Sequence, residues 1–538
     1  MARFKHYDYE QTKMIPLRFA DQIQPGTFEY TLNHVVDNEL DLTVFESRYR
    51  NDYNGAPAYD PALLLKIVLF AYSRGITSSR KIAQACRENI IFIALSADSQ
   101  PHHSTLADFI SRMDEVIAPL FTHVLMVCDG MNLIGREMFA IDGCKLPSNA
   151  AKEWSGTRAE LTRKQAKIDR AVARMLTAHH ASDQADKPPE ITEREQAQIK
   201  KLEQVSAKIK KHLATEPERL GQRGTAVKAN LTDNDSAKMT LLSGTIERKA
   251  RRVSLMDEAN NTAKGVIQGY NGVAAVDDKH QIIVHAQAYG AGQEQHTLLP
   301  MLTGIDKRIR DLNPTKPERG ILQRAQITAD SGFHSEANMK LIYRWGIDGY
   351  IADNQFRKRD PRFIDSTTYA QQQATRRKER GTKHSRFIPA DFDYDPHNET
   401  CRCPAGKAMW LSLKGQVAGK DVIRFQGYRK NCRVCPLKHQ CLRNPTQQEG
   451  RQVSYYPKAP KAAPSYMERM KHRIDSPMGR HIYSKRLGTV EPVFGNLESN
   501  KGLKRFTLRG KEKVNAQWLL YCMVHNIEKI ATQGKVMH

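Results

Sequence analysis

The sequence lacks any apolar run long enough to cross a membrane. Its longest apolar stretch, residues 63–72, is interrupted by Lys66 and is far shorter than the roughly 20 residues that a membrane-spanning helix needs. The first ten residues are rich in charge and contain no apolar segment typical of a secretory signal. We therefore expect a protein without a membrane span that works in the cytoplasm.

Acidic residues are scarce relative to basic ones. The chain has 59 Asp and Glu against 83 Lys and Arg, a net charge of +24, although its apolar fraction of 40% and charged fraction of 26% are ordinary. Such a surplus on a foldable composition predicts a polyanionic partner, double-stranded DNA first and an anionic membrane second. It also predicts an affinity for DNA that falls steeply with salt, because phosphate contacts release counterions.

Cysteines are also few, with nine in 538 residues, but five of them lie between residues 401 and 441. In a reducing compartment such a cluster predicts metal ligands before disulfides. The Cys-x2-Cys spacing lets two thiolates of one turn share a tetrahedral Zn²⁺. We expect one structural zinc, with Cys401 and His439 as spare ligands and with reduced, unliganded thiols as the alternative; the expected ligands are Cys403, Cys432, Cys435 and Cys441.

Residues 1–135 have the pattern of a helical domain. Pro61 after Asp60 predicts the start of a buried helix, and Ser78 and Ser104 are candidate caps of two more, the last running to Ile117. Helices that supply cations often grip a duplex, although short helical domains do many other jobs. We expect DNA binding here through the basic side chains of Arg48, Arg50, Arg74, Arg80, Lys81, Arg87 and Arg112.

Residues 136–354 predict the first part of an α/β catalytic core with a mixed sheet. A short buried strand over 137–142 is expected to end at Asp142, and an apolar strand over 325–328 leads into Asp330. Between them, residues 265–276 and 281–288 predict a β-hairpin. Within the insertion 150–264, charged and helix-favouring stretches predict a long helical hairpin of residues 157–176 and 193–213.

The C-terminal third divides into an insertion and the end of the core. Residues 355–480 lose regular periodicity and contain a basic run at 375–386, so we expect a small Cys-rich insertion without a core of its own. Residues 481–538 complete the catalytic core. Glu491 is expected near the start of a late helix, and residues 514–530 predict an apolar final helix.

Three carboxylates are the candidates for chemistry. Asp142, Asp330 and Glu491 meeting at one sheet edge would suit two Mg²⁺ or Mn²⁺ ions, which prefer hard oxygen ligands and can stabilise both oxygens of a phosphoryl displacement. Taken singly each is a weak signal, since an Asp at a strand end is usually a turn residue.

The residues around these carboxylates carry a resemblance. Ile141-Asp142-Gly143 with Lys145, Asp330-Ser331-Gly332-Phe333 with Asn338, and Tyr483, Arg486 and Glu491-Pro492-Val493-Phe494-Gly495 form three blocks along the chain. Together they resemble the DDE transposases of bacterial insertion sequences, which have a ribonuclease H-like catalytic domain. The helical N-terminus resembles the insertion sequence 1182 type of that family.

This resemblance implies a function and roles for further residues. It implies strand cleavage by metal-activated water and attack of the resulting 3′-hydroxyl on target DNA, by a homodimer assembled on DNA. Arg486 would hold phosphate, with a surface salt bridge as its alternative role, and Lys501 would replace the lysine that relatives carry at the position of Glu498. Gly332 would let backbone approach phosphate. Gln295 and His296 stand where relatives often carry an acid, so no metal ligand is expected there.

Two other functions remain open from the sequence. One is a metal-dependent DNA nuclease that cuts without strand transfer. The other is a DNA-binding regulator whose acidic triad has lost its metal, although the presence of all three carboxylates argues against it.

Overall fold

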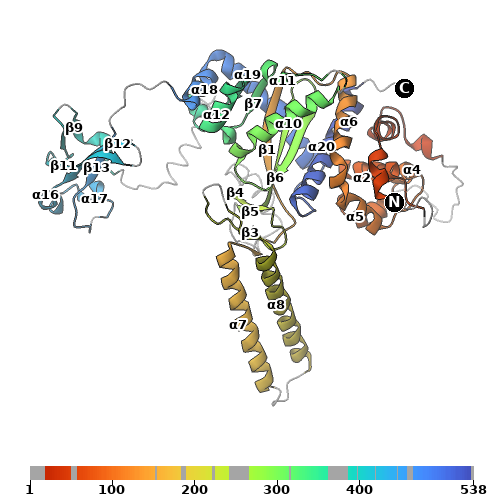
Figure 1. Cartoon of the computed structure of the whole chain (residues 1–538), viewed down its shortest axis with the longest axis horizontal. Coiled ribbons are helices and arrows are strands. Elements are labelled where there is room, and N and C mark those ends of the chain that lie inside the picture. The colour runs from red at the N-terminus through yellow and green to blue at the C-terminus, as the bar shows by residue number, and fades with distance from the viewer. Residues whose placement is uncertain are drawn as a thin grey trace, which may run out of the picture. The chain divides into compact units, whose positions relative to one another are not determined.

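The structure is a computed structural model that describes residues 18–49, 57–151, 154–182, 189–220, 224–240, 266–313, 315, 317–361, 386–396, 398–417, 420–444, 446–456 and 464–534. The chain forms two compact units (Figure 1). Unit 1 consists of Met1–Asp353 and Ser476–His538, and unit 2 of Asn354–Asp475. Arg50 and the basic run 375–385 lie outside the described residues.

A mixed sheet is the centre of unit 1. Its strand order is β4-β5-β1-β7-β8, and β6 pairs with β5 as well. The central strand β1 is antiparallel to β5 and parallel to β7, and the β5–β6 pair confirms the expected hairpin. The strands are β1 (Met138–Pro147), β4 (Ala237–Thr240), β5 (Val266–Asp277), β6 (Ile283–Tyr289), β7 (Gln326–Ala329) and β8 (Asp348–Ile351).

The first strand is longer than its sequence indicated. We expected it to end at Asp142, but β1 continues to Pro147, and Asp142 lies within it. The reason is tertiary: β5 pairs with β1 from Phe139 through Pro147, so the backbone of the polar segment after Asp142 finds its hydrogen bonds across the sheet.

Helices cover both faces of this sheet. Gly304 of α10 (Leu298–Asp311) packs on His285 of β6, whereas Trp518 of α20 (Lys511–Gln533) packs on Gly272 of β5. His285 pairs with Ala275, an odd number of residues from Gly272, so the two helices lie on opposite faces. The other long helices near the sheet are α12 (Glu336–Arg344) and α19 (Pro477–Gly495).

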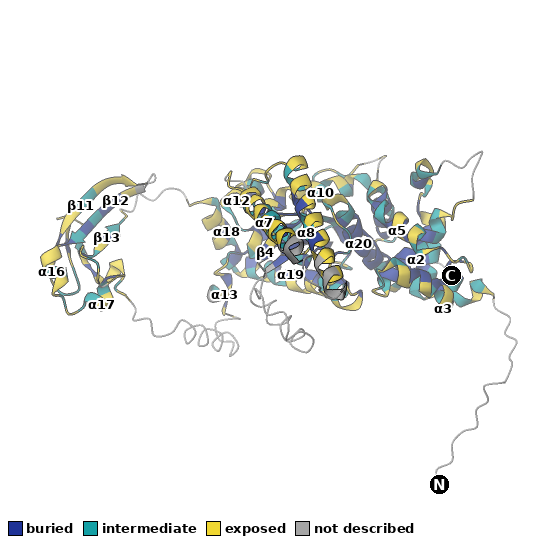
Figure 2. Ribbon diagram, turned by 90° about the horizontal axis from the view of Figure 1, so that it is seen from below, coloured by how far each residue is buried: buried dark blue, intermediate teal, exposed yellow. Residues whose placement is uncertain are grey.

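The final helix α20 holds the unit together. Its buried Asn526 side chain accepts from the backbone N–H of Ile283 and donates to the carbonyl of the same residue, at 2.9 Å each. Trp518 donates its indole N–H to the carbonyl of Val273. Figure 2 shows α20 as one of the most buried elements, as its apolar sequence predicted.

The N-terminal helices pack on α20 and belong to unit 1. The rings of Tyr72 and Tyr521 lie 4.8 Å apart. Asp60 caps the predicted helix at Pro61, but the helix expected from Ser104 to Ile117 is wrong: His102 caps a shorter helix, and a new one begins at Ile117. The helices are α1 (Phe28–His34), α2 (Pro61–Ser73), α3 (Ser79–Glu88), α4 (Ile90–Leu95), α5 (His103–Ser111) and α6 (Ile117–Gly130).

The late helix α19 begins at Pro477, well before the expected start near Thr489, so Glu491 lies in its last part. Proline at position 492 lacks an N–H and cannot bond the carbonyl of Gly488. Gln281 replaces that bond, because its side-chain amide donates to Gly488 at 3.0 Å. The helix therefore continues past Pro492 and passes into the π-helical turn η9 (Asn496–Asn500).

The charged insertion forms the expected helical hairpin. Helices α7 (Arg158–Ser182) and α8 (Pro189–Thr215) pack along each other, and Ser206 hydrogen-bonds Asp169 between them. Figure 1 shows the pair extending away from the sheet. The remaining short elements are β2 (Ser155–Gly156), β3 (Ala229–Asn230), η1 (Phe19–Gln22), η2 (Val35–Glu39), η3 (Thr43–Arg48), η4 (Met113–Glu115), η6 (Glu294–His296), α11 (Ile321–Arg324) and η7 (Ser331–Phe333).

Unit 2 has a core of its own, which corrects the expected coreless insertion. Five antiparallel strands form a sheet in the order β13-β12-β11-β10-β9, and Phe392, Met409, Phe425 and Val453 are among the side chains buried against it. Its apolar residues alternate too irregularly for the period to be recognised in the sequence. The elements are α13 (Phe356–Arg359), η8 (Pro389–Asp391), β9 (Asp393–Asp395), β10 (Thr400–Arg402), β11 (Ala408–Val417), β12 (Lys420–Gly427), α16 (Arg429–Arg433), α17 (Lys438–Cys441), β13 (Gln452–Tyr455) and α18 (Tyr466–Asp475).

A membrane-spanning helix is not found in the part of the chain that the structure describes.

Candidate active site

The parallel pairing of β1 and β7 brings two of the predicted carboxylates together. Ile141 pairs with Ala329, so the next residues, Asp142 and Asp330, are neighbours. Arg486 of α19 joins them. One guanidinium nitrogen, Nη1, lies 2.7 Å from Asp142 Oδ2, and the other, Nη2, lies 3.8 Å from Asp330 Oδ1. Two carboxylates therefore hold one cationic group.

This ion pair is largely removed from water. The side chain of Arg486 is 7% exposed, against 18% for Asp142. Burial raises the pKa of Asp142, the charge of Asp330 raises it further, and Arg486 opposes both by favouring the carboxylate. The guanidinium also lies over the ring of Tyr483, 5.8 Å from its centroid. Arg486 is thus a buried partner of strand carboxylates and not the surface salt bridge considered as its alternative role.

Backbone amides fix both aspartates. Asp142 Oδ1 accepts from the N–H of Gly143 at 2.8 Å, and Asp330 Oδ1 accepts from that of Ser331 at 2.5 Å. These bonds leave Asp142 Oδ2 to Arg486. The carboxylates are consequently held in place before any ligand arrives.

Glu491 lies on α19, the helix that also carries Arg486. Its side chain is exposed, and it lies five residues after Arg486, which is about 140° around a helix.

A carboxylate that the sequence reasoning missed lies nearer. Glu294, in η6 before α10, is 12% exposed, and its Oε1 lies 3.5 Å from Lys145 Nζ. Burial raises the pKa of Glu294, Lys145 lowers it, and the charges of Asp330 and Asp142 raise it again. An acid is thus present one residue before Gln295 and His296, and the structure shows that it lies in the electrostatic field of both aspartates.

Gly332 has a different neighbour from the phosphate that we expected. A Cβ built on Gly332 would lie 1.9 Å from Glu294 Oε2. Any side chain at position 332 would force the Glu294 carboxylate to move.

Lys501 is committed elsewhere in unit 1. Its ammonium lies 2.8 Å from Glu528 Oε2 of α20, and its side chain is 2% exposed. Burial and this ion pair hold the ammonium inside the protein, away from a phosphate at the surface. Its predicted role at phosphate has no support from this position.

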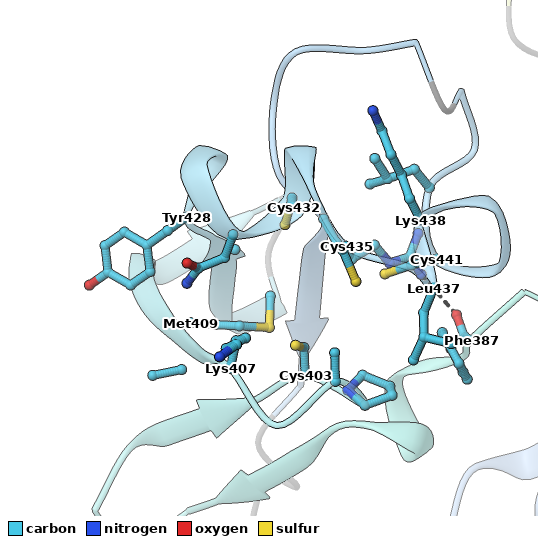
Figure 3. A pocket seen from close by; sticks show the side chains of 17 residues that line it. Phe387, Cys403, Lys407, Met409, Tyr428, Cys432, Cys435, Leu437, Lys438 and Cys441 are labelled. Carbon is cyan, nitrogen blue, oxygen red and sulfur yellow. Dashed lines mark hydrogen bonds between the residues drawn. The ribbon is translucent and has the colours of Figure 1, made fainter.

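In unit 2, the four predicted zinc ligands line one pocket. Cys403, Cys432, Cys435 and Cys441 surround a cavity of about 30 Å³, and Figure 3 shows their thiols directed into it. Burial, and then the neighbouring thiols, raise the pKa of Cys441 to about 11, whereas Arg451 lowers it. Cys401 is instead buried in the sheet core, with its sulfur 3.8 Å from the Tyr455 hydroxyl.

The described side chains do not form a preassembled metal site. In the described parts of the chain, no three His, Cys, Asp or Glu side chains are grouped tightly enough to hold a metal ion. In unit 1, the Arg486 guanidinium held by Asp142 and Asp330 shows that these carboxylates accept a cation between them.

The basic residues of the helical region divide into two kinds. Arg48 is 6% exposed and paired with Glu115, Arg74 is paired with Glu29, and Arg112 contacts Asp108. Of these three side chains only that of Arg48 is buried, whereas Arg74 and Arg112 are 57% and 41% exposed. In contrast, Arg80, Lys81 and Arg87 are exposed on α3 and lie free to meet a polyanion.

The chain matches two family models. Residues 402–531 match the family described as Transposase DDE domain, and residues 17–112 match Transposase domain (DUF772). The first match includes Arg486 and Glu491 but not the two aspartates. No curated protein and no solved structure matches.

Both matched families are transposase domains, and transposases act on DNA. Both matches support an insertion-sequence DDE transposase, in agreement with the resemblance, and the second match is typical of the insertion sequence 1182 type.

Proposed function

We propose that this transposase cleaves the ends of its insertion sequence and transfers the resulting 3′-hydroxyl to target DNA. The observation that carries the proposal is the pair Asp142 and Asp330, held side by side on parallel strands around one guanidinium. The proposed architecture is a ribonuclease H-like core. In it the two aspartates directly follow the last paired residues of the parallel strands β1 and β7.

The proposed ligands of Mg²⁺ or Mn²⁺ are Asp142, Asp330 and Glu491. Oxygen donors of this kind suit both ions. When bound, two divalent ions stabilise the attacking and the leaving oxygen of a phosphoryl displacement. Support for Glu491 comes from the motif that surrounds it and from its presence on the helix of Arg486.

Arg486 is proposed to change partners when substrate arrives. Its planar fork of N–H donors matches a phosphate as well as a carboxylate. If a divalent ion took its place at Asp142, the guanidinium, which lies over the ring of Tyr483, would be free to bind the DNA backbone. Lys501 acts indirectly, by tying η9 to α20 through Glu528.

A structural zinc is proposed for unit 2. Cys403, Cys432, Cys435 and Cys441 would hold it as thiolates, and four protein ligands would close the site to chemistry. The ion would stabilise the segments between β10 and β13, including α16 and α17, that carry the four cysteines.

The central test is cleavage of element-end DNA with Mg²⁺. Asp142→Asn, Asp330→Asn and Glu491→Gln should each reduce cleavage by at least about a hundredfold while leaving DNA binding intact, because they remove ligands and not phosphate contacts. Asp306→Asn, which alters an ion-paired aspartate of α10, is the matched control. Near wild-type cleavage by any triad variant removes that residue from the site. Cleavage without joined product would instead identify a nuclease, and binding without cleavage by the wild type a regulator.

The zinc proposal is tested by metal content. Protein purified without chelator should contain about one zinc per chain by atomic absorption. Cys432→Ser should lose the metal and lower the melting temperature, since metal binding is coupled to folding. Cys144→Ser, outside unit 2, is the control. Unchanged melting together with absent zinc in the wild type would refute the site.

The proposed assembly is a homodimer on DNA, because transposition joins two ends. The exposed hairpin of α7 and α8 is the candidate contact, and the proposed place of action is the cytoplasm. Sedimentation of the chain with end DNA should give two chains per complex. A chain lacking residues 158–215 should bind DNA without pairing ends, and paired ends formed by that variant would exclude the hairpin.

A further inference from the structure

A line of cations runs along the face of α7 that points away from α8. At 3.6 residues per turn, four exposed basic side chains lie within about 60° of one another around the helix and span about 16 Å of its axis. Leu161 and Val172, which are buried, lie about half a turn from this line. We call the line the α7 stripe; it consists of Arg163, Lys167, Arg170 and Arg174.

The α7 stripe contains no acidic side chain. Glu160 and Asp169 are the acids of α7. Asp169 lies against α8, with its Oδ2 3.9 Å from Lys210 Nζ. Glu160 pairs with Lys228 at 2.9 Å. The hydrogen bond from Lys228 is the main reason that the pKa of Glu160 is lowered, and the charge of Arg163 contributes least. Both acids of α7 are therefore engaged with cations outside the stripe.

Uncompensated charges in this arrangement destabilise a helix. Like charges three or four residues apart repel each other, whereas a solvated helix face usually alternates acidic and basic residues. Each neighbouring pair in the α7 stripe has one of these two spacings. A polyanion bound along the stripe would remove the repulsion. The arrangement therefore favours an anionic ligand over solvation alone.

Other cations of α7 have structural partners, in contrast to the stripe. Arg158 donates to the carbonyls of Leu213 and Glu216 at the end of α8, and Lys164 Nζ lies 4.3 Å from the ring centroid of Trp154. The three arginines of the stripe donate through Nε to carbonyls of their own helix. Such a bond uses one of the five N–H donors of a guanidinium, so the terminal nitrogens remain available to a ligand.

We propose that the α7 stripe binds the phosphate backbone of double-stranded DNA without reading its base sequence. Both matched families are transposase domains, and transposases act on DNA. About 16 Å of duplex carries roughly nine phosphate charges, which is enough to pair with all four cations. The planar fork of arginine matches phosphate oxygens, and three of the four stripe residues are arginine.

This contact is separate from the carboxylate site. The inference rests on the proposed function in one respect, that DNA is the substrate, and it assigns the helical hairpin a part in holding that substrate. The hairpin extends away from the sheet (Figure 1). Because the stripe points away from α8, α8 stays open to a second chain.

The test measures the affinity of the full chain for a short duplex of arbitrary sequence at several salt concentrations, without divalent metal. The stripe variant combines Arg163→Gln, Lys167→Gln, Arg170→Gln and Arg174→Gln, and glutamine has a helix propensity close to that of Lys and Arg. The slope of log affinity against log salt should become less steep by about 3 to 4, since each phosphate contact contributes about 0.9. Affinity at about 0.1 M salt should fall at least about tenfold.

The matched control removes the same charge from α8. It combines Lys200→Gln, Lys201→Gln, Lys208→Gln and Lys211→Gln, all at exposed lysines, and it should change the slope by less than about 1.

A second stripe variant keeps the charges. Arg163→Lys, Arg170→Lys and Arg174→Lys combined should retain the wild-type slope, because the slope depends on the number of charges that contact phosphate. If the glutamine variant of the stripe fails to fold, Arg170→Gln with Arg174→Gln replaces it, and its slope should change by about 2.

The outcomes separate this inference from the proposed function. A wild-type slope in the glutamine variant of the stripe would overturn the inference, and so would an equal change in that variant and in the α8 control. A wild-type slope together with loss of two-chain complexes in sedimentation would reassign the stripe to a protein contact. The proposed function fails separately, if the wild type binds DNA without cleaving it in Mg²⁺, and the salt slopes would still decide the role of the stripe.

Discussion

At the scale of residues, Arg486 neutralises the two aspartates when no metal is bound. Its guanidinium neutralises Asp142 and reaches Asp330 from a side chain that is only 7% exposed. A cation of fixed geometry thus occupies the place where the aspartates would hold Mg²⁺. Metal binding and the Arg486 contact should compete for the same oxygens.

Arg486→Gln should therefore increase the affinity for Mn²⁺ in the absence of DNA. It should also lower stability without metal by roughly 3 kcal/mol, because a buried carboxylate loses its partner. Calorimetry should show the tighter binding, and Mn²⁺ should raise the melting temperature more than in the wild type. Lys485→Gln, an exposed neighbour on α19, is the control, and weaker Mn²⁺ binding in Arg486→Gln would refute competition.

Lys501 is the second such residue, and its buried ion pair with Glu528 indicates a structural role. Lys501→Met should destabilise the protein by about 1–3 kcal/mol, since Glu528 loses a partner but is itself 37% exposed. Affinity for DNA and its salt dependence should not change, because the ammonium is buried. Chemical denaturation and binding titrations measure the two effects. A weaker salt dependence of DNA binding in Lys501→Met would restore a direct phosphate contact.

At the scale of elements, α20 connects the sheet, η9 and the N-terminal helices. His525 illustrates how. One ring nitrogen lies 2.9 Å from the carbonyl of Gln281, and the other lies 3.1 Å from the amide nitrogen of Asn496. Burial lowers the pKa of His525 to about 4, although the bond to Gln281 opposes this. The histidine is therefore neutral in the folded protein.

Acid should destabilise the protein through this histidine. The unfolded chain takes up a proton near pH 6.5 and the folded chain only near pH 4. Stability is thus complete above pH 6.5 and decreases as the pH falls toward 4, by up to about 3 kcal/mol. His525→Gln should show a smaller loss over this range in denaturation curves. His481→Gln, exposed on α19, should behave like the wild type, and equal losses in both variants would contradict the assignment.

At the scale of the whole molecule, the two units differ in how they depend on the rest of the chain. The helical region of unit 1 covers α20, through α1, α2 and α6. Unit 2 buries its own cluster around Phe425. The N-terminal region shares its core with α20, so its removal should disrupt unit 1, whereas unit 2 has a separate core.

A chain lacking residues 1–135 should therefore lose its cooperative thermal transition, because the ring of Tyr521 and other apolar side chains of α20 lose their cover. A chain in which a flexible linker replaces residues 354–475 should keep the transition of unit 1. Differential scanning calorimetry compares the two. A cooperative transition of normal enthalpy in the first variant would show that the helical region folds separately.

Local signals were enough to predict much of the molecule. The family, the helical hairpin, the β5–β6 pair and the last helix follow from motifs and from periods of 2 and 3.6 residues, which depend only on neighbours in the chain. Asp60 and Pro61 predicted the start of α2 for the same reason. The grouping of Cys403, Cys432, Cys435 and Cys441 around one pocket also agrees with their spacing.

Long-range pairing decided the rest. β1 extends past Asp142 because β5 bonds its backbone, and α19 continues past Pro492 because Gln281 replaces the lost hydrogen bond. Glu294 faces the aspartates only because η6 and η7 meet in space. The partner of Arg486 lies 344 residues away in the chain. No pattern of neighbouring residues predicts this contact, because the two side chains meet only after the sheet has formed and α19 has packed against it.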